Sequence, residues 1–104
     1  MNIEKEPFTN KIDIIAKIHL CCCEYFNVPS QKVLSRDRHD DCCNARAYAW
    51  YILHHDYGMS ITTLSKHYGR KRRNVFHVLS KITYLIDNQR LYRKMYSDIQ
   101  KSIT

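Results

Sequence analysis

The sequence predicts an all-α fold, a compact helical domain of about five to six helices that contains a helix-turn-helix. The chain of 104 residues has only two Gly and two Pro, so little in it interrupts helices. Apolar residues recur at helical spacing, and nothing predicts a strand. Two helical segments are separated by a short turn at Gly69, as in a helix-turn-helix. We expect an N-terminal tail at residues 1–9 and one domain at residues 10–104.

The first half of the chain carries three helical patterns. Apolar positions of residues 11–26 stop at Asn27, which tolerates a left-handed helix end, and the expected inward side chains are Ile12, Ile15, Ala16, His19, Cys22, Cys23 and Phe26. Ser30 is a good N-cap for a short helix that ends near Ser35. Asp40 or Asp41 should cap a third helix that runs to Gly58, with Trp50 as a core anchor.

The second half predicts two helices around the Gly69 turn and one more after it. Ser60 should cap a helix that runs to Tyr68. A long helix from Lys71 to Asp87 then places its apolar residues on one stripe, formed by Val75, Val78, Leu79, Ile82, Leu85 and Ile86. The last helix, after Asn88, should pack back onto the others, dimerise or meet a protein partner through Leu91, Tyr92, Met95, Ile99 and Ile103.

The positive charge of the chain is concentrated in one quarter of the sequence. Residues 58–82 hold six Lys and Arg and no Asp or Glu, and the whole chain has a net charge of +7. A concentrated positive field attracts polyanions, which favours nucleic acid over an anionic membrane surface as the partner. Four of these cations, residues 70–73, lie where a helix begins and where the helix dipole disfavours cations. Entry of that helix end into the major groove of DNA would explain their position, and the alternative is a solvated basic turn that only aids solubility.

Several other classes of function are disfavoured by the residues. The five cysteines lack the spacing of a zinc site, and although His19 and Cys23 could share a metal with Cys42 or Cys43, reduced thiols are the better interpretation. No nucleophile is paired with a base, so we expect no enzyme, no metal and no cofactor. No segment resembles a signal peptide or reaches the roughly 18 to 20 apolar residues of a membrane span. We expect a soluble, cytoplasmic protein that does not bind a membrane.

The run Tyr68-Gly69-Arg70-Lys71-Arg72-Arg73-Asn74-Val75-Phe76-His77-Val78-Leu79-Ser80-Lys81-Ile82 resembles the signature of the C-terminal DNA-binding domain of the bacterial replication initiator DnaA. That signature is approximately F-G-G-R-D-H-[ST]-T-V-x-H-A-x-x-K-I. The resemblance extends upstream, in the right order, through residues 24–28, 33–35, 45–47 and 60–64, and it covers roughly residues 10–100. It implies a Trp-repressor-like helical fold that binds duplex DNA, with a role in replication or its regulation.

The resemblance also implies which residues contact DNA. Arg38 occupies the place of an arginine that enters the minor groove, and Arg46 that of an arginine that contacts the DNA backbone. The positions that would face phosphates or base edges are Thr62, Lys66, Arg70 and Asn74, and those at the readout positions are Arg72 and Arg73. Lys71 completes the basic run. His77 is a weaker candidate, because its neighbours are apolar and favour a histidine that packs in the core.

The sequence departs from the family pattern at the start of the long helix, and its turn is one residue shorter than in that pattern. Lys71 and Arg72 replace the Asp-His pair, which exchanges a hydrogen-bond acceptor for donors and favours guanine or phosphate over cytosine. We therefore expect weak binding to the usual initiator box. The chain also has no phosphate-binding loop, so no nucleotide cofactor is expected.

Acidic residues leave an alternative open. Asp37, Asp40 and Asp41 dilute a loop that is basic in the family, as in a protein-interaction module that keeps the fold but has lost DNA binding. A DNA-binding domain should show one positive face that joins Arg38, Arg46 and residues 70–73. An interaction module should instead expose an apolar patch within residues 91–103.

Overall fold

The computed structural model describes residues 11–35 and 40–103. Its elements in chain order are the α-helices and one π-helix, η2, as follows: α1 (Lys11–Phe26), α2 (Ser30–Leu34), α3 (Asp40–Tyr51), η2 (Ile52–Asp56), α4 (Ile61–Tyr68), α5 (Arg72–Asn88) and α6 (Arg90–Ile103). No strand occurs in these two ranges. The prediction of an all-α fold with about six helices is confirmed.

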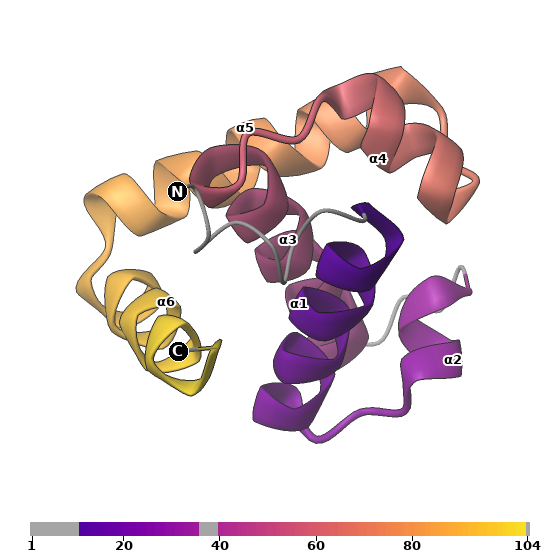
Figure 1. Ribbon diagram of the computed structural model, residues 1–104. Helices are drawn as coiled ribbons and strands as arrows, with labels where there is room; N and C mark the ends of the chain where they lie inside the picture. The colour runs from indigo at the N-terminus through magenta and orange to yellow at the C-terminus, as the bar shows by residue number, and fades with distance from the viewer. Residues whose placement is uncertain (1–10, 36–39, 104) are drawn as a thin grey trace, which may run out of the picture.

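Helix α3 lies at the centre of the molecule (Figure 1). It contacts α1, α2 and α5, while α6 packs on α1 and α5. Helix α5 runs along one side of the molecule, with α4 near its start and α6 after its end (Figure 1). The two helices expected around the Gly69 turn are therefore adjacent, and they contact each other.

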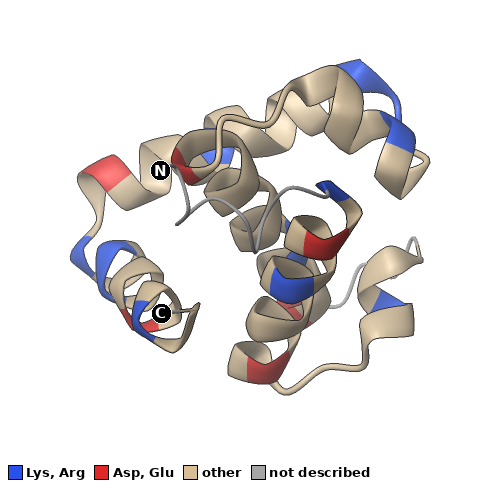
Figure 2. Ribbon diagram, viewed as in Figure 1, with Lys and Arg blue, Asp and Glu red and all other residues tan. Residues whose placement is uncertain are grey.

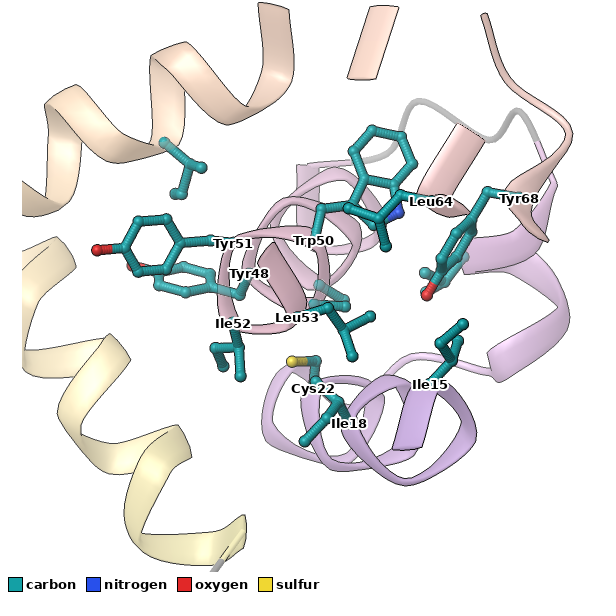
Figure 3. Close-up of a cluster of buried hydrophobic side chains, with 14 of the residues drawn as sticks. Ile15, Ile18, Cys22, Tyr48, Trp50, Tyr51, Ile52, Leu53, Leu64 and Tyr68 are labelled. Carbon is teal, nitrogen blue, oxygen red and sulfur yellow. The ribbon is translucent and has the colours of Figure 1, made fainter. Parts of the chain in front are cut away.

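The core forms where α3 meets α1 and α4 (Figure 3). Trp50 is 1% exposed, and Ile18, Tyr48 and Leu64 are fully buried. The prediction of Trp50 as a core anchor is confirmed. The Trp50 ring meets the Tyr68 ring edge to face, with centroids 5.3 Å apart, an arrangement that adds to the stabilisation from burial alone.

The inward face of α1 differs in part from the predicted one. Ile15, His19, Cys22 and Cys23 are buried as expected, but Ile12 is 63% exposed and Ala16 is also exposed. Ile14 and Ile18 are buried in their place. Apolar residues occupy more than one side of α1. Periodicity alone therefore selected a stripe next to the one that α3 and α6 cover.

The third helix ends in a π-helical segment that the sequence pattern did not predict. The amide of Tyr57 donates to the carbonyl of Ile52 at 3.3 Å, and His54 Nδ1 lies 2.7 Å from the carbonyl oxygen of Met59. Ile52 and Leu53 remain buried while His54 to Asp56 face solvent. Gly58 then adopts a φ of 69°, and the chain turns into α4.

Of the predicted N-caps, Ser60 is confirmed and Ser30 is wrong, while Asp40 and Asp41 lie inside the first turn of α3. The Ser60 hydroxyl accepts a hydrogen bond from the amide of Thr63 at 3.1 Å, so Ser60 caps α4 as expected. Ser30 instead occupies the first turn of α2, because the extended residue before it is Pro29 and no side chain caps that helix. Asn27 ends α1 with the expected left-handed φ of 56°.

Helix α6 packs back onto the rest of the domain. The Tyr48 hydroxyl donates to the carbonyl of Tyr92 at 2.8 Å, and the Tyr96 hydroxyl donates to Asp56 Oδ1 at 2.8 Å. Ile99 is fully buried, whereas Leu91 is 63% exposed. The expected apolar side of this helix is therefore used largely inside the domain. None of the helices in the described part of the chain has the length and apolar character that a bilayer crossing requires.

Candidate nucleic-acid interface

The turn between α4 and α5 is short and its geometry is set by Gly69. Gly69 has a φ of 63°, a left-handed conformation that favours glycine, and it ends α4. The amide of Arg70 donates to the carbonyl of Ser65 at 2.9 Å, which closes the helix end. Lys71 is extended and α5 starts at the next residue. Only three residues separate the two helices, as in a helix-turn-helix.

Buried apolar residues hold the two helices of this motif on the core. Leu64 of α4 and Val75 of α5 are fully buried, and Leu79 and Ile82 follow on the same stripe of α5. Tyr68 closes the end of α4 against Trp50 (Figure 3). The predicted apolar stripe of α5 is confirmed, so its other side is left to face solvent.

The solvent side of the motif gathers the predicted polar residues. Those exposed on or beside α5 are Lys71, Arg72, Arg73, Asn74 and His77, and those exposed on α4 are Thr62 and Lys66. The Lys and Arg residues at the start of α5 form the blue segment at the upper right of Figure 2. The prediction of His77 as a core histidine is wrong, because Val75 and Leu79 provide the packing side of the helix.

The chain segment around the start of α5 carries hydrogen-bond donors and no acidic residue. No Asp or Glu occurs between Asp56 and Asp87. The first turn of α5 holds no acidic residue, and no side chain caps it. Helix N-terminal amides and cationic side chains both favour an anion at such a position. The surface can therefore donate hydrogen bonds to phosphate oxygens and to acceptors on base edges.

Arg46 and Arg70 lie differently from the exposed cations. Arg46 is 7% exposed, so the expectation that it lies on the exposed positive face is wrong. Its Nε donates to the carbonyl of Val33 at 2.9 Å, and its Nη2 donates to the carbonyl of Ser35 at 3.0 Å. Arg70 is half-buried, and its Nη2 also donates to the carbonyl of Ser35.

Two further predictions bear on this region. Arg38, expected to enter the minor groove, lies outside the described residues. The apolar patch expected of an interaction module is largely absent from the described part of α6, where Ile99 is buried and Tyr92, Met95, Tyr96 and Ile103 are half-buried.

A family model for the bacterial DnaA protein helix-turn-helix matches residues 15–82 of this sequence. The chain belongs to this family. The matched range runs from α1 to α5 and contains both helices of the motif. The fold class and the family that the sequence resemblance predicted are confirmed.

A curated relative within the DnaA family is the chromosomal replication initiator protein DnaA of Mycoplasma genitalium. It is 26% identical over 77 residues, which cover 74% of this chain and 18% of the relative. The chain therefore spans less than a fifth of the length of that initiator.

The cysteine-rich region between α1 and α3 shows no metal-binding geometry. No group of three or more His, Cys, Asp or Glu side chains in residues 11–35 and 40–103 could hold a metal ion. His19 Nδ1 is instead within 2.8 Å of the Tyr68 hydroxyl oxygen. Burial raises the pKa of the Cys22 thiol, so this thiol stays protonated.

Proposed function

We propose that this chain binds double-stranded DNA and that the start of α5 enters the major groove. The observation that carries the proposal is the exposed surface at the start of α5, where cations and hydrogen-bond donors gather with no acidic residue between Asp56 and Asp87. An α-helix fits the major groove, and the N-terminal part of the second helix of this motif contacts base edges. Membership in the DnaA helix-turn-helix family supports the same function.

The exposed side chains divide into two proposed roles. Lys71, Arg72 and Arg73 stand at the N-terminus of α5, where an arginine can bind the O6 and N7 acceptors of guanine with two hydrogen bonds. Phosphates would be held on either side of the groove by Thr62, Lys66, Asn74 and His77. Arg38 remains a predicted contact to the minor groove.

The proposed biological role is in DNA replication or its regulation. The curated relative is a replication initiator, but this chain matches only 18% of it. We therefore propose a DNA-binding module that acts without catalysing a reaction and without a nucleotide of its own. It would act together with separate proteins or domains that supply the other activities of an initiator.

Fluorescence anisotropy with labelled duplexes tests the proposal. The chain is titrated into a random duplex and into an initiator-box duplex at salt concentrations from about 50 to 200 mM. If about five phosphates are neutralised, affinity falls by about 500-fold across this range. Because Lys71 and Arg72 replace the Asp-His pair of the family pattern, we expect little preference for the box. Absence of binding to either duplex at the lowest salt would overturn the proposal and favour a protein partner.

A further inference from the structure

The side chain of Arg46 reaches from α3 to the end of α2. Its Nε and Nη2 donate to the carbonyls of Val33 and Ser35, and its Nη1 lies 3.9 Å from Cys43 Sγ. All three guanidinium nitrogens thus have a partner within the domain. With an exposed fraction of 7%, the residue is a buried cation that satisfies the last carbonyls of a short helix.

The same Ser35 carbonyl oxygen accepts a second hydrogen bond, from Arg70 Nη2. Arg70 lies between Gly69 and Lys71, inside the three-residue turn that leads into α5. One carbonyl oxygen has two lone pairs, so it can accept from both guanidinium groups at once. The carbonyl of Ser35 therefore joins α2, α3 and the turn of the helix-turn-helix.

Trp50 completes this junction. It follows Arg46 by one helical turn on α3, so both side chains share a face of that helix. The guanidinium carbon of Arg70 lies 6.0 Å from the centroid of the Trp50 ring, at the distance where a cation is attracted to an aromatic face. Arg70 is thus held from one side by Trp50 and from the other by the carbonyl that Arg46 fixes.

We propose that Arg46 is a positioning residue of the DNA interface, which sets the place of Arg70 and the start of α5 through the Ser35 carbonyl and does not itself touch DNA. The inference rests on the proposed function and changes the role that the family resemblance implied for this arginine. The planar fork of arginine can reach two carbonyls at fixed angles, whereas a lysine provides one flexible ammonium. Arg46→Lys therefore keeps the positive charge but cannot donate to the carbonyls of Val33 and Ser35 at the same fixed angles.

Salt dependence separates positioning from phosphate contact. We expect Arg46→Lys to weaken duplex binding about tenfold while the slope of log K against log salt stays at the wild-type value. A residue that contacts phosphate changes that slope by about 0.9 when its charge is removed. Arg46→Gln, which does remove the charge, should also leave the slope unchanged, and Lys66→Gln, at an exposed residue proposed to hold phosphate, is the comparison that should lower it.

A DNA-free measurement follows the junction itself. Trp50 is the only tryptophan of the chain, so its indole resonance and fluorescence report on one site. We expect Arg46→Lys to shift the Trp50 signal in the same direction as Arg70→Lys, with little further change in the double variant. Measurements are made well below the unfolding temperature of each variant, so that a loss of stability alone does not alter affinity.

A lower salt slope in Arg46→Gln would mean that Arg46 contacts phosphate and would overturn the inference. If Arg46→Lys bound duplex DNA with wild-type affinity, Arg46 would only stabilise the fold, and the inference would also be overturned. If the wild-type chain binds no duplex, the proposed function fails, and the Trp50 signal alone decides whether Arg46 positions Arg70. An unchanged Trp50 signal would then refute the inference.

Discussion

His19 of α1 and Tyr68 of α4 are joined by a hydrogen bond of 2.8 Å between Nδ1 and the phenol oxygen. Both residues are 5% exposed. Tyr68 is the last residue of α4 and precedes Gly69, so this bond ties the first helix to the turn of the helix-turn-helix. Burial lowers the pKa of His19 and raises that of Tyr68, so both groups are neutral near pH 7.

The lowered pKa of His19 predicts a loss of stability in acid. As the pH falls below about 6.5, the unfolded chain binds a proton at this histidine before the folded chain does. The free energy of unfolding should therefore decrease as the pH drops from about 6.5 towards the lower folded pKa. His19→Gln, whose amide oxygen can accept from Tyr68, should show a flatter pH dependence in urea unfolding. The exposed His77→Gln is the control, and a wild-type pH dependence in His19→Gln would contradict the prediction.

The two serines at helix starts predict different effects of the same substitution. Ser60→Ala removes the hydrogen bond to the Thr63 amide and should destabilise the domain by about 1 kcal/mol. Ser30→Ala removes no cap, because Pro29 holds that position, and should change stability much less. Urea unfolding of both variants compares them directly. Equal losses would mean that the Ser60 hydrogen bond does not stabilise α4.

Substitutions at Gly69 should lower the free energy of unfolding through backbone conformation alone. No atom lies within 4 Å of a Cβ added there, but the φ of 63° disfavours a side chain. Gly69→Ala should therefore destabilise the domain by about 1 to 2 kcal/mol, and Gly69→Asn by less, because Asn adopts this conformation more readily. The loss corresponds to a thermal midpoint lower by about 4 to 8 °C per kcal/mol. If Asn costs as much as Ala, backbone conformation is not the cause.

The positions that distinguish this chain from the family pattern predict its base preference. Lys71 and Arg72 are exposed at the start of α5 and supply donors only. Restoring the pattern with Lys71→Asp and Arg72→His should raise the affinity for an initiator-box duplex relative to a random one. Competition binding measures that ratio, and each bidentate base contact is worth about 1 to 3 kcal/mol. A ratio equal to that of the wild type would show that other residues set the preference.

Most elements with a short-range signal were predictable, the N-cap at Ser30 being an exception. Ser60, Gly69 and the apolar stripe of α5 each depend on neighbouring residues, and the structure confirms all three. The π-helix at Ile52–Asp56 was not predictable, because its residues fit an ordinary helical pattern and only the tertiary packing shows the change. The same holds for α1, where the choice between Ile12 and Ile14 depends on which face α3 and α6 cover.

The sequence predicted where the candidate site lies, but not which side-chain hydrogen bonds hold it in place. The charge pattern located the basic run of residues 70–73, and the structure exposes Lys71, Arg72 and Arg73. The burial of Arg46 depends on the carbonyls of Val33 and Ser35, which no local pattern brings to α3. The exposure of His77 could have been inferred from its neighbours, since Val75 and Leu79 already complete the packing stripe.

Two pairs of substitutions that remove equal charge, one from the start of α5 and one from α6, test most directly whether the start of α5 binds DNA. Arg72→Gln/Arg73→Gln changes the start of α5, and Arg90→Gln/Lys101→Gln changes α6, whose first residue, Arg90, follows the other end of α5 about 25 Å along its axis. If the start of α5 reads base edges, the first pair should lower the affinity for duplex DNA about tenfold or more at one fixed salt concentration, and the second pair should leave it nearly unchanged. Equal losses of affinity in both pairs would show that the chain is held by its overall charge and would contradict α5 as the DNA-binding element.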